Sequence, residues 1–473
     1  MSGGTKVRAW DRGGMDRPDP DLLGSLPGRF GHAVIAFTDP DGYPVSVATS
    51  FEVRPADGLI VLKAVAGEEV TPPHGHQVNV VFSHIRPQPG YGYDERDYVS
   101  MWGEIRRGPG HLTFRPERCQ RWGEHEMSFF EYNERGVAQA RSYMDDLSRE
   151  LGRPVRPRLA FGWLFLRATR LPFLSATVVP VGVGISVAAL HGQWRWWLGV
   201  LTIVAAAFVH LGLNVANDVF DTASGADEAN VTPTQFSGGS RVIHYGLLTA
   251  GQMRTMSAAF YAVGLGIGLY LAAVTAFWAL AAIGVIGTFI SYFYTAPPLR
   301  LVHRGIGEAA VFLGFGPVMA LGAYMVQSQR FSWEPVYASL PVGILVAIIL
   351  YVNEIPDRPG DAAAGKRTLP VRWSKEAVLL GYDLAVTAAA LLIVIGVATG
   401  VMPVPLILSL AGFPLALKVR RGLRAHYDSP YELMPFMGTN IQLHAAVGML
   451  MIVGYGISIA VAHLVHSPPG LLV

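Results

Sequence analysis

Long apolar stretches dominate the last two thirds of the chain, and each is long enough, or nearly so, to cross a lipid bilayer as a helix. The apolar core of a bilayer is about 30 Å thick and needs about 20 residues of helix. There are nine such segments, of which the eighth is the shortest, at approximately 171–191, 196–216, 256–274, 276–294, 307–327, 335–353, 376–399, 402–417 and 441–464. The pattern predicts an all-α bundle of nine transmembrane helices within residues 161–465.

The residues before the membrane segments contain shorter apolar runs. Apolar runs separated by Gly- and Pro-rich turns predict five strands, at 32–38, 43–51, 59–64, 77–84 and 97–106. Apolar positions at helical spacing follow over 127–151, and the strands suggest a small β-barrel. We therefore expect five parts, namely a polar tail at 1–24, a β-barrel domain with a C-terminal helix at 25–152, a linker at 153–160, the membrane domain at 161–465 and a second tail at 466–473.

Charge divides the chain at the same place. Residues 1–158 hold 20 of the 37 Lys and Arg and 22 of the 35 Asp and Glu, which indicates a soluble domain joined to one that the lipid bilayer surrounds. The net charge of +2 gives no reason to expect a nucleic-acid partner. The lone Cys119 excludes an internal disulfide and argues against a cysteine-bound metal. Residues 1–30 lack the apolar stretch of a cleavable signal peptide, so we expect the first membrane helix to target the protein.

Basic residues are concentrated on one side of the predicted bundle. The loops after the second, fourth, sixth and eighth segments carry 13 Lys and Arg, whereas the opposite side carries only Arg195 and Arg330. Basic loops are typically cytoplasmic. We therefore expect a multi-pass protein of the plasma (cytoplasmic) membrane, with these loops and the N-terminal domain in the cytoplasm and the C-terminus outside.

Two acidic clusters lie at the ends of the second and sixth segments, in a region otherwise poor in charge. They comprise Asn217, Asp218, Asp221 and Asp227 in the first, and Asn353, Glu354, Asp357 and Asp361 in the second, which continues into Gly-Lys-Arg at 365–367. Residues four apart on a helix share one face, about 6 Å apart along the axis, so oxygens at 217/221 and 353/357 can converge on a hard cation. Carboxylates at membrane depth are costly and are usually retained for function. The clusters predict a site for Mg²⁺ and a diphosphate.

Further motifs surround the clusters. Tyr-Thr-Ala-Pro-Pro-Leu-Arg at 294–300 precedes Gly-Ile-Gly-Glu at 305–308, and Phe-Ser-Gly-Gly-Ser-Arg at 236–241 follows the first cluster. With the nine segments, these features resemble the UbiA superfamily of intramembrane prenyltransferases over residues 160–465. The sequences of both clusters look most like the 1,4-dihydroxy-2-naphthoate prenyltransferases of menaquinone biosynthesis. One departure is the gap of six residues from Asp221 to Asp227, which is longer than is usual in the superfamily.

The resemblance implies an enzyme that transfers a prenyl group from a polyprenyl diphosphate to an aromatic quinone precursor with the help of Mg²⁺. The metal ligands would be Asp218, Asp221, Asp227, Asp357 and Asp361, and all but Asp227 would also count, with Lys366, as catalytic. Substrate contacts would come from Asn217, Asn353, Arg241, Arg300, Arg367 and Tyr294. Cationic side chains would offset charge on the leaving diphosphate, apolar walls would shield an allylic cation from water, and the ring of Tyr294 would stabilise that cation.

Other interpretations of these residues remain open. Asn and Asp at helix ends could cap the helices, the Lys and Arg at 366–367 could be topology signals, and Tyr294 could be an interfacial aromatic residue. A transporter would also place acids in the membrane, although mostly near its middle and on broken helices. The acids here lie at helix ends beside Lys and Arg, which favours the diphosphate site.

The N-terminal domain has a resemblance of its own. Its strand spacing and the Asp-Gly-Tyr-Pro turn at 41–44 resemble the split-barrel family of pyridoxamine 5'-phosphate oxidases and flavin reductases over about residues 25–125. Many members of that family bind FMN, for which Lys63 or Arg106 could serve here. The other interpretation is a docking module that pairs with a second copy to form a homodimer. We interpret its six histidines, at 32, 74, 76, 84, 111 and 125, as solvated rather than as metal ligands.

Overall fold

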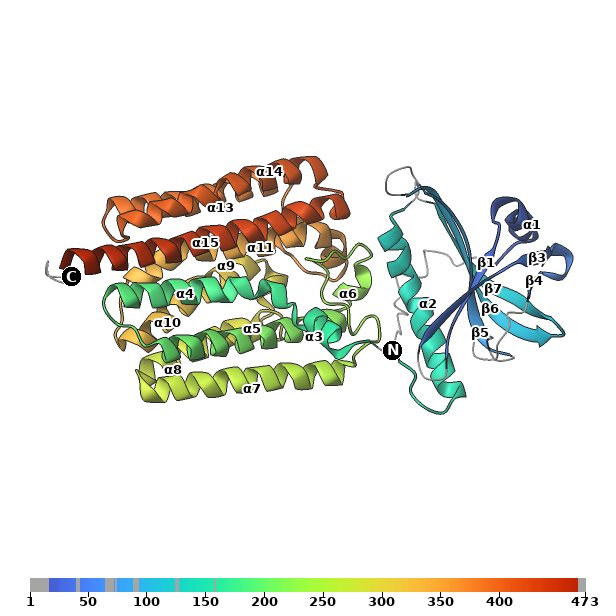
Figure 1. Ribbon diagram of the computed structural model, residues 1–473, viewed down its shortest axis with the longest axis horizontal. Helices are drawn as coiled ribbons and strands as arrows, with labels where there is room; N and C mark the ends of the chain where they lie inside the picture. Colours follow the sequence, from blue (N-terminus) through green and yellow to red (C-terminus); the bar gives the residue numbers. More distant parts are fainter. Residues whose placement is uncertain are drawn as a thin grey trace, which may run out of the picture. The chain divides into compact units, whose positions relative to one another are not determined.

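The computed structural model describes residues 17–39, 43–63, 72, 75–87, 93–123, 127–156 and 159–466 (Figure 1). The chain divides into two compact units, one of residues 1–160 with 245–247 and the other of residues 161–244 with 248–473. Most of the expected N-terminal tail, the turn at 40–42, His74, His125, part of the linker and the tail from 467 on lie outside the described residues.

Unit 1 is built on a curled antiparallel sheet of seven strands in the order β2-β1-β5-β6-β7-β4-β3. The strands are β1 Ala33–Thr38, β2 Pro44–Thr49, β3 Phe51–Arg54, β4 Leu59–Lys63, β5 Gln77–Pro87, β6 Tyr93–Gly108 and β7 His111–Gly123. In this order β2 and β3 are the two edges, so over the described residues the sheet is an open half-barrel. The expected strand at 43–51 is therefore two strands, at opposite edges of the sheet.

Two elements of unit 1 were not predicted. Strand β7 was missed because exposed charged residues, among them Arg115, Arg118 and Arg121, interrupt its apolar positions. Helix α1 (Pro20–Arg29) begins at the N-cap Asp19, whose carboxylate accepts a hydrogen bond from Leu22 N, and was hidden in a polar segment.

The two faces of the sheet are covered differently. Leucines of α1 pack with inward residues of the strands in an apolar core. Helix α2 (Phe129–Glu150) lies on the other side of the sheet (Figure 1). It contacts the strands through polar and aromatic side chains, as in the hydrogen bond from Thr38 N to the Tyr143 hydroxyl of 3.1 Å. Because strand residues alternate between faces, one strand serves both surfaces.

Unit 2 is a bundle of roughly parallel and antiparallel helices (Figure 1). Its α-helices are α3 Phe161–Thr169, α4 Ser175–Leu190, α5 Trp196–Ser224, α6 Ala226–Ala229, α7 Ala250–Val274, α8 Phe277–Phe293, α9 Gly307–Leu313, α10 Met319–Ser328, α11 Glu334–Ala363, α12 Leu369–Arg372, α13 Lys375–Ala398, α14 Pro414–His426 and α15 Pro430–His466. Between α9 and α10 the chain makes a π-helical turn, Gly314–Val318, that contains Pro317.

Within the part of the chain that the structure describes, six helical stretches are long and apolar enough to cross a membrane: α5, α7, α9 with α10, α11, α13 and α15. Helices α4 and α8 are apolar but shorter. The eighth expected segment is a 3-10 helix, Val404–Gly412, followed by α14, since Pro414 cannot donate to a continuous helical ladder. The six helices indicate an integral membrane protein, and the count of nine crossings stays a prediction.

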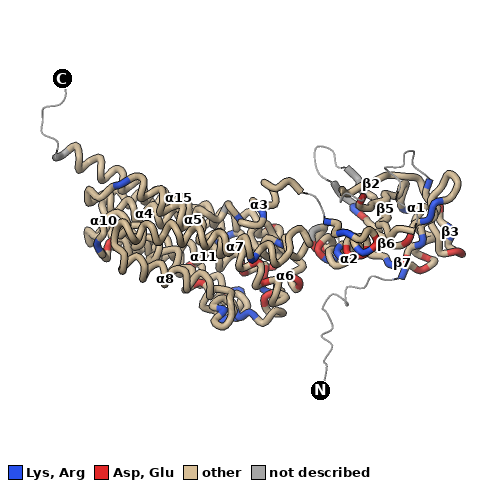
Figure 2. Tube along the Cα trace, turned by 90° about the horizontal axis from the view of Figure 1, so that it is seen from below, with Lys and Arg blue, Asp and Glu red and all other residues tan. Residues whose placement is uncertain are grey.

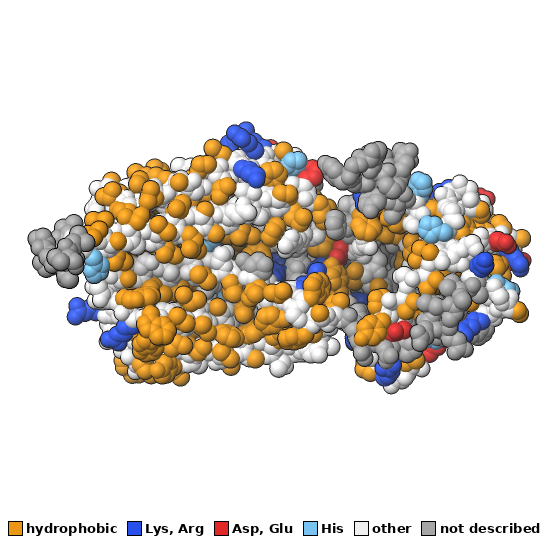
Figure 3. Space-filling model, in the orientation of Figure 1, with side chains coloured by type: hydrophobic (Ala, Val, Ile, Leu, Met, Phe, Trp, Pro, Cys, Tyr) orange, Lys and Arg blue, Asp and Glu red, His pale blue; other side chains and the backbone are white. Residues whose placement is uncertain are grey.

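The surface of unit 2 agrees with a lipid environment. Hydrophobic side chains cover most of its visible face (Figure 3), and large ones such as Trp278 and Val285 are 83% and 69% exposed. Few charged residues lie along the length of the helices, and acidic residues gather near α6 (Figure 2). Exposed apolar area of this extent on a bundle is expected where lipid, not water, is the solvent.

Glycines set the closest approaches between helices in unit 2. A Cβ at Gly184 of α4 would lie 2.1 Å from the carbonyl oxygen of Ala320 on α10, and one at Gly264 of α7 would lie 2.9 Å from the carbonyl oxygen of Ala205 on α5. Small residues let membrane helices pack backbone to backbone, which replaces the hydrophobic driving force that lipid does not supply.

The close contact at Gly184 predicts that Gly184→Leu destabilises the bundle, because α4 and α10 would have to separate. Overpacking of a tight core typically costs about 1–3 kcal/mol, so the thermal midpoint of the purified protein in detergent should fall by several degrees. The matched control is Gly266→Leu on α7, where a Cβ meets no atom within 4 Å. Equal midpoints for the two variants would contradict this packing.

The membrane orientation that we expect from the basic loops places two positions on opposite sides of the membrane. Glu228, which is exposed on α6, should be cytoplasmic, and Ser467, which follows the last helix, should be external. In a Cys119→Ser background, an impermeant thiol reagent applied to intact cells should label Ser467→Cys and leave Glu228→Cys unlabelled. Labelling of both or neither would mean that the count of crossings is wrong by one, with residues 402–417 the first segment to reconsider.

Candidate active site

A cavity of about 880 Å³ lies within unit 2 and is chemically divided. One part is lined by apolar side chains of several helices, among them Leu271, Leu280, Ile283 and Phe315. The other part is lined by polar residues of both acidic clusters, namely Asn217, Asp221, Asn353, Glu354, Asp357, Asp361 and Lys366. The residues at 237–239, in the loop after α6, also line it. The cavity therefore suits a molecule with one charged and one apolar end.

Helix α5 splits the first cluster between two surroundings. It stays helical to Ser224, where Gly225 at φ 80° ends it. Asn214, Asn217 and Asp221 follow one another at three- and four-residue spacing and line the cavity. Asp218 is one residue from Asn217, which is about 100° around the helix, and is absent from the residues that line the cavity within the described chain.

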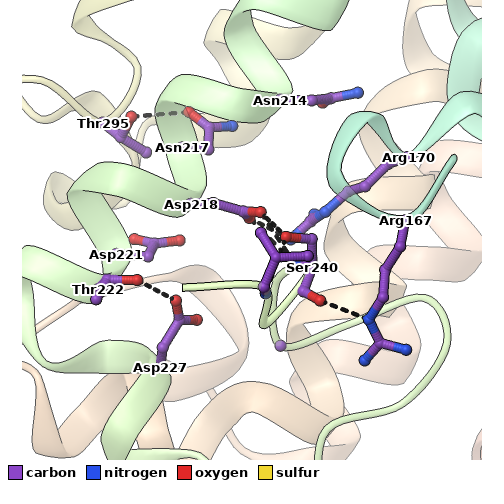
Figure 4. A network of polar contacts seen from close by, with 12 residues as sticks. Arg167, Arg170, Asn214, Asn217, Asp218, Asp221, Thr222, Asp227, Ser240 and Thr295 are labelled. Atoms are coloured by element: carbon purple, nitrogen blue, oxygen red, sulfur yellow. Dashed lines mark hydrogen bonds and ion pairs between the residues drawn. The ribbon is translucent and has the colours of Figure 1, made fainter. Parts of the chain in front are cut away.

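Asp218 is held by a polar network (Figure 4). Its carboxylate lies 3.1 Å from Nη2 of Arg170 and accepts hydrogen bonds from the backbone N–H, at 3.2 Å, and the hydroxyl of Ser240. The side chain is only 2% exposed. Asp218 thus fastens the loop after α6, and the turn that carries Arg170, to helix α5.

Asp227 and Arg241 hold the same loop from its other end. Thr222 Oγ1 donates to Asp227 Oδ2 at 2.9 Å, and burial, together with the charges of Asp221 and Asp218, raises the pKa of Asp227 to about 7. Arg241 donates to the backbone carbonyl oxygens of Asp227 and Asn230, the latter at 2.8 Å. Both side chains are buried, and neither is among the described residues that line the cavity.

The second cluster lies on one face of α11. The helix continues to Ala363 although it contains Pro356 and Pro359, so Asn353, Asp357 and Asp361 keep a four-residue spacing and all line the cavity. Asp357 accepts hydrogen bonds from Nδ2 of Asn230 at 2.7 Å and from the backbone N–H of Gly238 at 2.9 Å. The loop that Asp218 anchors to α5 is therefore also bound to α11.

Lys366 joins the two clusters. Its Nζ lies 2.8 Å from Oδ1 of Asp221 and 3.3 Å from Oδ1 of Asp361, and the residue is 7% exposed. Burial by itself would lower the pKa of Lys366, but the carboxylates of Asp221 and Asp361 outweigh burial and raise it above its usual value. A buried ammonium group, whose charged form the two carboxylates favour, thus stands between α5 and α11.

The described residues hold no group of three or more His, Cys, Asp or Glu close enough to bind a metal by themselves. Mg²⁺ usually takes only one or two carboxylates and completes its shell with water and substrate phosphates. The oxygen ligands that face the cavity suit this mode, since they come from Asp221, Asp357 and Asp361, and Oδ1 of Asn353 is buried without a hydrogen-bond partner. These residues fit a Mg²⁺ ion that binds together with a diphosphate.

Other predicted contacts lie elsewhere. Tyr294 is buried and lines the cavity, whereas Arg300 and Arg367 are exposed and are not among the described lining residues. Sequence reasoning missed Arg170, which lines the polar part of the cavity, and Thr295, whose hydroxyl donates to Oδ1 of Asn217 at 2.7 Å. The positive φ of 52° at Arg170 has no sequence signal, because Arg does not favour that region.

Comparison with known proteins identifies the family of the chain. The model of the "UbiA prenyltransferase family" matches residues 177–441. The "2-carboxy-1,4-naphthoquinone phytyltransferase" of Synechocystis sp. is 31% identical over 62% of this chain and 93% of its own length. The "1,4-dihydroxy-2-naphthoate octaprenyltransferase" of Mycobacterium tuberculosis is 34% identical over 50% of this chain and 82% of its own.

Among solved structures, the chain aligns with "a UbiA homolog from Archaeoglobus fulgidus bound to GPP and Mg2+" at 16% identity and a TM-score of 0.43, over 61% of this chain and 99% of that one. The family match covers more than half of the chain and contains both acidic clusters. The chain therefore belongs to the UbiA prenyltransferase family.

Proposed function

We propose that this protein transfers a polyprenyl group from its diphosphate to a 1,4-dihydroxy-2-naphthoate-type acceptor, as in menaquinone biosynthesis. The observation that carries the proposal is the divided cavity, which joins two carboxylate clusters and Lys366 to an apolar chamber between helices. A polyprenyl diphosphate has the same division between a charged head and an apolar chain. The acceptor follows from the relatives, two of which are named for naphthoate or carboxynaphthoquinone substrates.

At the polar end, the side chains of Lys366 and Arg170 would contact the diphosphate. Asp221, Asp357 and Asp361, with Asn353, would hold Mg²⁺, which offsets the charge of the diphosphate when bound. Asp218, Asp227 and Arg241 would act at one remove. Asp218 binds Ser240 and Arg170, the Asp227 carboxylate accepts a hydrogen bond from Thr222, and Arg241 binds the backbone carbonyls of Asp227 and Asn230. Their contribution is to fix the residues at 237–239 against the cavity.

At the apolar end, the helices would hold the isoprenoid chain and exclude water. The bond between the allylic carbon and the diphosphate oxygen breaks, and the electron pair leaves with the diphosphate. The allylic carbon then bonds to an electron-rich ring carbon, which regains aromaticity by losing the proton that it carried or, at the carboxylate-bearing position, by losing the carboxylate as CO2 and keeping the bonding electron pair. Tyr294, buried at the wall of the cavity, would place its ring beside the developing cation.

Lys366 supplies the first test. Lys366→Met removes the cation between Asp221 and Asp361, so the diphosphate loses a contact and turnover should fall by roughly 10²-fold. Lys418→Met is the matched control, because Lys418 is exposed on α14 and does not line the cavity. The measurement is the rate of naphthoate prenylation by purified protein. Similar rates for the two variants would remove Lys366 from the site.

The metal ligands supply the second test. Asp221→Asn or Asp357→Asn should each lower the rate by about 10²-fold or more, and EDTA should abolish turnover until Mg²⁺ is restored. Asp428→Asn is the control, because the Asp428 carboxylate is 71% exposed and pairs with Arg358 at the surface. Mass spectrometry of the products from 1,4-dihydroxy-2-naphthoate and a polyprenyl diphosphate identifies the reaction. Normal turnover in either cavity variant, or in EDTA, would contradict the assignment.

A further inference from the structure

Unit 1 contains a second cavity of about 490 Å³, between the sheet and helix α2. Its lining residues come from β1, β2, β5, β6, β7 and α2, so unit 1 forms it alone. The volume lies in the range of about 300–1,000 Å³ that is typical of small-molecule sites. Asn133 and Ala140 of α2, which are exposed, stand at its rim. Unit 1 therefore has room for a small-molecule ligand, which could enter from solvent past these two residues.

Aromatic rings form much of the wall. Six aromatic side chains line the cavity, namely Phe37, Tyr98, Trp102, Phe129, Tyr132 and Tyr143. Tyr98 and Tyr132 are stacked, with ring centroids 6.3 Å apart and planes 26° apart, so a strand and α2 present parallel rings. Walls of this kind favour planar aromatic ligands, which stack on rings or meet their edges.

The polar groups that the described residues bring to the wall are uncharged. Hydroxyl and amide groups come from Ser46, Asn79, Gln120 and Asn133. The Tyr132 hydroxyl is hydrogen-bonded to Ser100, and the Tyr143 hydroxyl accepts from Thr38 N. Burial raises the pKa of Tyr132 and of Tyr143, so both phenols stay neutral at physiological pH. The described lining residues of the cavity offer hydrogen bonds but no counter-ion.

This lining does not fit FMN. Among the residues that the structure describes, those that line the cavity include no Lys, Arg, His, Asp or Glu. Lys63 is exposed at the end of β4, and Arg106 is exposed and bonded to Glu104 at 3.1 and 3.3 Å, so neither candidate phosphate contact reaches the cavity wall. A phosphate dianion without cationic partners is costly to bury.

We propose that this cavity binds a neutral, planar bicyclic aromatic ring of the naphthol or naphthoquinone class. The choice of a two-ring system rests on the function proposed for unit 2, whereas the requirement for a neutral, planar ligand rests on the wall of the cavity. The same wall excludes a ring that bears a carboxylate, because the charge would be buried unpaired. Unit 1 thus selects the uncharged ring over the naphthoate-type acceptor of unit 2.

The test uses the full chain in detergent and a photoreactive azide derivative of 1-naphthol, with cross-linked peptides identified by mass spectrometry. We expect cross-links in the peptides that carry the lining residues of β1, β6 and α2, such as Phe37, Tyr98 and Tyr132. Unlabelled 1-naphthol should prevent them, 1-hydroxy-2-naphthoate should compete at least roughly ten-fold more weakly, and FMN should not compete.

A cavity-filling variant supplies the matched comparison. Gly136 of α2 lines the cavity, and a Cβ there meets no atom within 4 Å, so Gly136→Phe should fill the space without distorting the helix and abolish the unit 1 cross-links. Gly24→Phe on α1, where a Cβ is equally free and which lines neither of the two cavities described, should leave them unchanged.

The outcomes separate the two proposals. Displacement by FMN, equal competition by the naphthoate, the same labelling in Gly136→Phe and Gly24→Phe, or cross-links confined to unit 2 would each overturn the proposal for unit 1. Cross-links are assigned by peptide and do not depend on turnover. A protein that lacks prenyl transfer but is labelled in unit 1 as expected would therefore count against the proposed function alone.

Discussion

Buried carboxylates at the ends of apolar helices are the constraint on which unit 2 depends. Isolated charges there would be expensive, and removing one partner of a buried ion pair typically costs about 3–5 kcal/mol. Lys366 forms ion pairs with Asp221 and Asp361, and Arg170 forms an ion pair with Asp218. Because these cations come from segments before α4 and after α11, satisfying the carboxylates also fixes those segments at the polar part of the cavity.

The helical period then decides which acidic residues line the cavity and which bind the neighbouring loop. On α5, Asn217 and Asp221 line the cavity, while Asp218 binds Ser240 of the loop after α6 and Arg170 of the turn before α4. On α11, Asp357 does both, since it lines the cavity and binds the loop at Gly238. A motif that looks uniform in sequence therefore holds ligands for a charged substrate beside residues that keep the loop in place.

The two cavities of the chain follow opposite electrostatic designs. The cavity of unit 2 gathers carboxylates and cations at one end and continues into apolar space, which suits an amphipathic ion. The cavity of unit 1 gathers aromatic rings, hydroxyls and amides, and its phenols stay neutral because burial disfavours the phenolate. We therefore propose that ligands of different charge bind to different parts of one protein.

The sequence by itself determined the features that have a local signal. Apolar length marked the membrane helices, and four-residue spacing on α11 marked a face with Asn353, Asp357 and Asp361. Tertiary structure decided which contacts join distant segments, because no periodic pattern in the sequence predicts such contacts. It paired Arg170 with Asp218, turned Arg241 toward backbone carbonyls instead of the cavity, and set Lys366 between two helices. It also placed β2 and β3 at opposite edges of the sheet, since strand order is chosen by packing across the whole domain.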